Sequence, residues 1–159
     1  MLSSRSVSRV TITAYPHETA ALSPFSLHIL NERFDSQVAS AAQVLYVLCP
    51  VFSSVVDLTL KSQHCWSDPW TEWENENEVD PTLWRTILRS FHDVDTLHIS
   101  SSLVKRLSRS LQLNDRGSPM DLLPCLKELV HSASSKTSDA FTEFINARQK
   151  AGYPVTLRD

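Results

Sequence analysis

Glycine is scarce in this chain of 159 residues, which contains only Gly117 and Gly152. Average usage in proteins is about 7 %. The P-loop and the dinucleotide-binding turn both need clustered glycines, because the backbone has to approach a phosphate closely. The sequence has no such cluster, so it excludes nucleotide binding by these two routes, and we predict no cofactor.

Cysteines are few, and long apolar runs are missing. Cys49, Cys65 and Cys125 are widely spaced, odd in number and without a C-x-x-C pair, which is typical of reduced thiols inside the cell. The first residues, MLSSRSVSRV, lack the apolar run of a secretory signal. The most apolar stretch, residues 44–60, is interrupted by Pro50 and falls short of the roughly 20 apolar residues that a membrane-spanning helix needs. We therefore expect no membrane segment and a location in the cytoplasm or nucleus.

Charge is nearly balanced overall but unevenly distributed. The formal net charge of −3 gives little reason to expect a nucleic-acid partner. The basic residues at 105, 106 and 109 are interpreted as a solvated helix face. No lysine or arginine lies between Lys61 and Arg85, and this interval contains six acids: Asp68, Glu72, Glu74, Glu76, Glu78 and Asp80.

The same acidic interval contains three tryptophans. Trp66, Trp70 and Trp73 lie four and three residues apart in the sequence WSDPWTEWENENEVD. One interpretation is a partner-binding loop, because tryptophan on an acidic background suits a basic or aromatic ligand. The alternative is an insertion whose tryptophans fold back onto the core. Either interpretation places an insertion at about residues 63–80.

A helix that leads directly into a strand is predicted over residues 81–100, PTLWRTILRSFHDVDTLHIS. The apolar residues of this helix recur at three- and four-residue spacing: Leu83, Trp84, Ile87, Leu88 and Phe91. Leu97 and Ile99 then alternate with polar residues, as expected for a strand with one covered face.

This strand pattern repeats along the chain. The pattern V-x-x-[VL]-x-[IL] begins at Val7, Val55 and Val94. Looser copies contain the pairs Leu27 and Ile29, Leu126 and Leu129, and Val155 and Leu157. Helical patterns fill three of the gaps, at residues 36–49, 102–113 and 139–151.

Strands joined by helices of this length are usually parallel. The residues between the core positions of the strands are mostly polar, so we expect one face of the sheet to lack a helical layer. Parallel strands with helices on one face, in repeats of about 20–40 residues, indicate an α/β fold of the leucine-rich-repeat-like solenoid type. We predict a single such domain over residues 1–159. The pairing of the first two strands stays open, because residues 17–24 are too few for a helical crossover.

Three motifs resemble the C-terminal leucine-rich-repeat-like region of fungal F-box proteins. They are W-x-x-[IL]-L-x-x-F-x-x-V-x-x-L-x-[IL]-S at residues 84–100, L-P-x-L-x-x-L at 123–129 and F-x-x-x-R-Q-x-A-G-x-P-V-x-L at 144–157. The resemblance covers residues 50–159 best and implies a role in substrate recognition within a ubiquitin ligase. The F-box itself, which binds the ligase adaptor, is not in this sequence. The adaptor is therefore expected as a partner only if an F-box precedes Met1.

No residue pattern indicates catalysis or a metal site. The many serines lie in no G-x-S-x-G elbow, and no nucleophile, base and orienting residue form a recognisable set. The candidate metal ligands follow no zinc spacing, and we interpret them as strand-surface histidines and core thiols: His64, Cys65, His92, His98, Cys125 and His131. We therefore predict no metal site and no enzyme, with an unrecognised hydrolase as a remote alternative.

The function predicted from these observations is a non-enzymatic protein–protein interaction module. The alternative is a free-standing structural or regulatory repeat protein without ligase coupling. Polar side chains on the uncovered sheet face suit a protein surface better than a small molecule, because they do not converge on a closed apolar pocket. The expected partner-binding residues are Thr59, Lys61, Thr96, His98, Glu128, Thr156 and Arg158, together with Trp66, Trp70 and Trp73.

Overall fold

A computed structural model gives the fold of residues 7–17, 23–31, 34–48, 52, 54–65, 81–112, 118, 120–132 and 141–158. The strands in this part of the chain are β1 (Val7–Pro16), β2 (Phe25–Asn31), β3 (Val55–Cys65), β4 (Thr96–Ser100), β5 (Glu128–Ser132) and β6 (Thr156–Arg158). The helices are α1 (Phe34–Leu48), α2 (Pro81–Arg89), α3 (Ser101–Leu111) and α4 (Thr142–Lys150). The predicted α/β class is confirmed.

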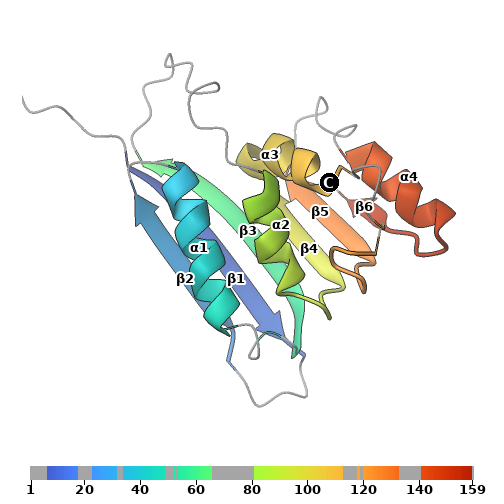
Figure 1. The fold of residues 1–159 in the computed structure, drawn as a ribbon, viewed down its shortest axis with the longest axis horizontal. Coiled ribbons are helices and arrows are strands. Elements are labelled where there is room, and N and C mark those ends of the chain that lie inside the picture. The colour runs from blue at the N-terminus through green and yellow to red at the C-terminus, as the bar shows by residue number, and fades with distance from the viewer. Residues whose placement is uncertain are drawn as a thin grey trace, which may run out of the picture.

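The strands form one sheet in the order β2-β1-β3-β4-β5-β6 (Figure 1). Strands β3 to β6 are parallel and lie side by side in chain order. Strand β1 is antiparallel to both of its neighbours, with Val10 opposite Ile29 of β2 and Ile12 opposite Leu60 of β3. The prediction of a mostly parallel sheet is confirmed. The pairing that the sequence left open is an antiparallel β1–β2 hairpin, and α1 then crosses β1 to reach β3.

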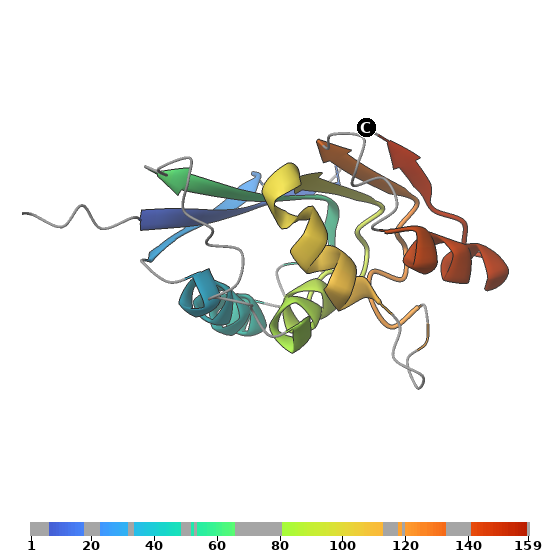
Figure 2. The same cartoon turned by 90° about the horizontal axis from the view of Figure 1, so that it is seen from above.

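The helices lie on one side of the sheet, as Figures 1 and 2 both show. Alternate strand residues point toward them and are buried: Val10, Ile12, Ala14, Leu58, Leu60, Leu97, Ile99 and Leu129. The helices contribute the opposing half of the core, with Val38, Leu45, Trp84, Leu88, Leu103 and Leu107 all buried. The apolar spacing of residues 81–100 therefore predicted both the buried side of α2 and the buried side of β4 correctly.

A series of backbone hydrogen bonds joins the amino ends of the parallel strands. The Asp95 N–H donates to the Val56 carbonyl at 2.9 Å. The Asp95 carbonyl in turn accepts from the N–H groups of Lys127 at 2.8 Å and Glu128 at 2.9 Å. The Thr156 N–H then donates to the Lys127 carbonyl at 2.8 Å. These bonds align the amino ends of the four strands β3 to β6 with one another.

Serine side chains extend the pairing of β3 beyond the point where β4 turns into α3. The Ser62 N–H donates to Ser100 Oγ at 3.1 Å, and Ser102 Oγ donates to the Ser62 carbonyl at 3.0 Å. Ladder pairing between the two strands ends at Leu60 and Ile99. The two hydroxyls therefore satisfy backbone groups of β3 that a longer β4 would otherwise pair.

Arg148 of α4 is buried, although it is a charged residue in the last turn of the helix. Its relative exposure is 0 %, and its Nη1 donates to the Leu123 carbonyl at 3.1 Å. Its Nη2 donates to the carbonyls of Pro124 at 3.1 Å and Leu126 at 2.9 Å. Burial lowers the pKa of the Arg148 guanidinium from its ordinary value, and the nearby Cys125 opposes this shift. These hydrogen bonds connect α4 to the segment that precedes β5.

Two predictions about single side chains are wrong. His131 was predicted on the strand surface, but it is only 1 % exposed and faces the helices, because β5 alternates Leu129 and His131 on the covered side. Cys125 was predicted as a core thiol, but it is exposed, because it lies in the turn before β5. None of the helices in the described part of the chain has both the length and the hydrophobicity to cross a bilayer.

Candidate functional site

The sheet face opposite the helices is the candidate functional site. We call it the open face and define it by the half-buried and exposed side chains that alternate with the core positions. On β2 and β1 these are Ser26, His28, Leu30, Arg9, Thr11 and Thr13. On the parallel strands they are Asp57, Thr59, Lys61, Gln63, Thr96, His98, Ser100, Glu128, Val130, Thr156 and Arg158.

Strand register arranges the predicted site residues in rows across the parallel strands. The first row pairs Asp57 with Thr96, Thr96 with Glu128, and Glu128 with Thr156. The second row pairs residues two positions further along each strand: Thr59, His98, Val130 and Arg158. Each strand contributes one side chain to each row, because the side chains of a strand return to the same face every second residue.

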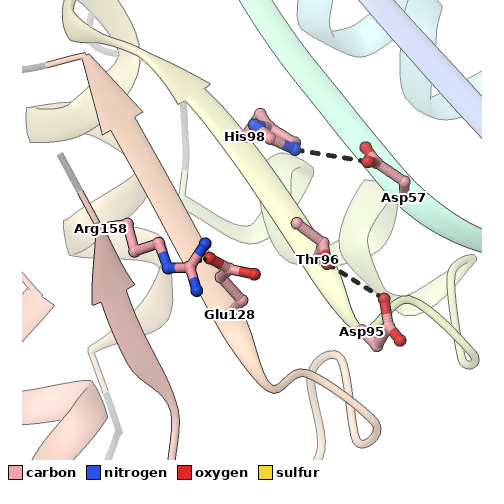
Figure 3. Close-up of polar contacts among 6 residues, drawn as sticks. All are labelled: Asp57, Asp95, Thr96, His98, Glu128 and Arg158. Carbon is pink, nitrogen blue, oxygen red and sulfur yellow. Dashed lines mark hydrogen bonds and ion pairs between the residues drawn. The ribbon is translucent and has the colours of Figure 1, made fainter.

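Two contacts between oppositely charged or chargeable groups cross neighbouring strands (Figure 3). His98 Nε2 lies 3.4 Å from Asp57 Oδ2, and Arg158 Nε lies 2.6 Å from Glu128 Oε1. Just before β4, Asp95 accepts a 3.1 Å hydrogen bond from Thr96 Oγ1. The carboxylates of the open face thus contact groups of the protein itself.

On the other half of the open face, hydroxyl groups of β1 and β2 surround His28. Thr11 Oγ1 lies 3.1 Å from His28 Nδ1, and Ser26 Oγ lies 3.0 Å from His28 Nε2. Thr13 Oγ1 lies 3.4 Å from Ser26 Oγ. These contacts fix the His28 ring between hydroxyl groups of the hairpin.

All seven strand residues predicted to bind a partner lie on the open face: Thr59, Lys61, Thr96, His98, Glu128, Thr156 and Arg158. Their role in binding stays a prediction. Trp66, Trp70 and Trp73 lie outside the described residues, as does most of the predicted insertion at 63–80; β3 extends through Cys65, and α2 begins at Pro81.

Sequence reasoning missed the contribution of the N-terminal hairpin to this face. Arg9, Thr11 and Thr13 alternate with core residues in the sequence, which was the available signal. They were not assigned to the site, because the pairing of the first two strands was open. The antiparallel register with β3 places Thr13 beside Thr59, Thr11 beside Lys61 and Arg9 beside Gln63.

Neither the metal-ligand search of the described residues nor the comparisons with known proteins point to a second candidate site. The described residues include no group of three or more His, Cys, Asp or Glu side chains that could hold a metal ion. The chain matches no protein-family model and has no significant match among curated proteins or solved structures. We therefore infer function from the open face and from the sequence motifs quoted above.

Proposed function

We propose that the chain is a non-enzymatic protein–protein interaction module and that a partner binds to its open face. The observation that carries this proposal is the row of polar side chains that successive parallel strands supply. These side chains alternate with the core positions, and the helices lie on the other side of the sheet (Figure 2). A broad row of this kind matches an extended protein surface, because each strand adds a contact at a regular spacing of about 4.8 Å.

The leucine-rich-repeat-like character of the module is part of the same proposal. Strands β3 to β6 follow one another in chain order, with a helix before each of them. The hydrogen bonds from Val56 through Asp95 and Lys127 to Thr156 recur at the entry of each strand. Solenoid proteins stack one supersecondary unit on the next in this manner and bind partners on the extended surface that results.

The proposed biological role is substrate recognition for a ubiquitin ligase, which follows from the resemblance to F-box proteins. In this role the open face selects the target, and a separate F-box recruits the ligase adaptor. Residues 1–159 alone are therefore expected to capture a target without the adaptor. Recovery of the adaptor with this chain in stoichiometric amount would contradict that division of labour.

The proposal is tested by affinity capture from a native lysate with matched triple variants. The open-face variant carries alanine at three positions: Lys61, His98 and Glu128. The control variant carries alanine at exposed residues of the same three types that do not lie on the open face: His92, Lys105 and Glu143. Both variants lose only exposed or half-exposed polar groups, so melting temperatures are expected to stay within about 2–4 °C of the parent.

Quantitative mass spectrometry then compares the proteins that the three chains recover. We expect the open-face variant to lose at least one abundant partner by about tenfold, which corresponds to about 1.4 kcal/mol of binding free energy. The control variant should retain that partner. An unchanged partner list for the open-face variant, or equal losses in both variants, would contradict binding at the open face.

A further inference from the structure

Two cations of the open face have no counter-charge among the described residues. Arg9 on β1 and Lys61 on β3 make no hydrogen bond or ion pair with any described residue, and Arg9 Nε is buried without an acceptor there. The register places Lys61 opposite Thr11 and Arg9 opposite Gln63, so the two cations are diagonal neighbours on adjacent strands. Diagonal side chains in a sheet are about 7–8 Å apart at most, within reach of one ligand.

The acids of the open face are in a different situation. Glu128 is bound to Arg158, and Asp57 lies against His98. Asp57 is also four residues from Lys61 on the same strand, which is about 13 Å in an extended chain. Among the described residues, the uncompensated charge of the open face is therefore positive and is concentrated at the Arg9 and Lys61 end of β1 and β3.

A buried N–H without an acceptor costs free energy that a bound acceptor would recover. Arg9 is only half-exposed, and a carboxylate that reached its guanidinium would accept charge-assisted hydrogen bonds. The exposed amide of Gln63 lies beside Arg9 on one side, and Leu30, which is 56 % exposed, lies beside it on the other. A ligand at this place therefore meets two cations, an amide and an apolar side chain.

We propose that the open face binds an acidic segment of its protein partner in extended conformation, with carboxylates over Arg9 and Lys61. This inference rests on the proposed function, because it specifies the chemistry of the partner at the same face. Acidic residues two positions apart in an extended segment point to one side, about 6.6 Å from each other. That spacing matches the two-residue offset between Arg9 and Lys61 along the strands.

The test uses a fluorescein-labelled peptide of alternating glutamate and threonine as the probe. Its control replaces every glutamate with glutamine. Fluorescence anisotropy with the full chain is measured at about 0.02 M and about 0.15 M salt, because screening weakens contacts between exposed charges. The glutamate probe is expected to bind, more weakly at the higher salt, and the glutamine probe is expected not to bind.

Two double variants remove the same amount of positive charge from different places. The first carries Arg9→Gln and Lys61→Gln, and we expect it to bind the glutamate probe about tenfold more weakly, equivalent to about 1.4 kcal/mol. The second carries Lys105→Gln and Lys150→Gln, which removes exposed cations of α3 and α4 that do not lie on the open face. It should bind within about twofold of the parent, because these cations lie away from the proposed site. Circular dichroism melts check that both variants remain folded.

Several outcomes would overturn the inference. Equal binding of the two probes would show that the glutamates are not recognised. Equal losses in the two double variants would show that the probe is attracted by the overall charge of the protein and not by a site at Arg9 and Lys61. Tighter binding of a single-stranded RNA oligomer than of the glutamate probe would identify the wrong class of partner. Binding of the probe only after Asn or Gln replaces the acids of residues 68–80 would show that the chain's own acidic stretch occupies the cations. If the probe fails while the open-face triple variant still loses its partner, the inference is wrong and the proposed function stands.

Discussion

At the scale of single residues, the buried Arg148 connects α4 to the segment that precedes β5. Its guanidinium donates to three carbonyls between Leu123 and Leu126 and lies 5.8 Å from the centre of the Phe144 ring. Leu123 has a φ of 50°, in the left-handed region that residues other than glycine rarely adopt. Arg148 therefore connects α4 to a turn with a left-handed residue and supplies charged donors to three of its carbonyls.

Replacing this side chain is expected to destabilise the protein strongly. Arg148→Met should lower the free energy of unfolding by about 3 kcal/mol, because three carbonyls lose a charged donor. Arg148→Lys should recover only part of the loss, since one ammonium group cannot match the planar guanidinium. Lys150→Met on the same helix is the control and should change stability by less than about 0.5 kcal/mol, because Lys150 is exposed. Urea titrations measure all three, and equal effects at the two positions would contradict this role.

The residue scale is also where sequence reasoning failed most. Arg148 lies four residues after Phe144 and shares its buried side of α4, but the sequence alone does not show which groups accept hydrogen bonds from a charge buried there. Its acceptors are carbonyls of a loop that lies more than 20 residues earlier in the chain. His131 was misassigned for a related reason, because the loose β5 pattern did not fix which of its residues face the helices.

At the scale of elements, the two sides of β4 have different surroundings. Leu97 and Ile99 are buried under the helices, whereas Thr96 and His98 lie on the open face between β3 and β5. Substitutions on the two sides should therefore have different consequences. The covered side determines stability, and the open side is available for a partner.

This difference is measurable by chemical denaturation. Leu97→Ala should destabilise the protein by about 2–5 kcal/mol, because it removes buried methyl groups and leaves a cavity. Thr96→Ala should cost about 0.5–1 kcal/mol, since it removes one half-exposed hydrogen bond to Asp95. If the two substitutions had the same effect, the two faces of β4 would be assigned wrongly.

Elements with strong periodicity could be predicted from the sequence, and their pairing could be predicted only in part. The spacing in α2 and β4 identified both elements and their buried sides. Parallel pairing of β3 to β6 followed from the helices between them. The place of β1 between β2 and β3 could not be derived, because that arrangement depends on contacts between segments about 50 residues apart, such as Val10 with Ser62.

At the scale of the whole molecule, the sheet combines a covered face that builds the core with an open face that spans six strands (Figures 1 and 2). The candidate site could be predicted on the parallel strands, because their alternation is regular. Its N-terminal part, including Arg9, could not, because it depends on the hairpin register. We propose that a protein partner contacts this open face.

Site-specific photo-crosslinking can detect contact between a protein partner and the open face. A photoreactive phenylalanine analogue placed at Thr59 or Thr96 lies on the open face, and the same analogue at Lys105 lies exposed on α3 as the control. Irradiation in a native lysate is followed by purification of the chain and identification of the crosslinked proteins. We expect the same discrete partner from both threonine positions and none from position 105. A partner crosslinked from position 105, with none from Thr59 or Thr96, would contradict it.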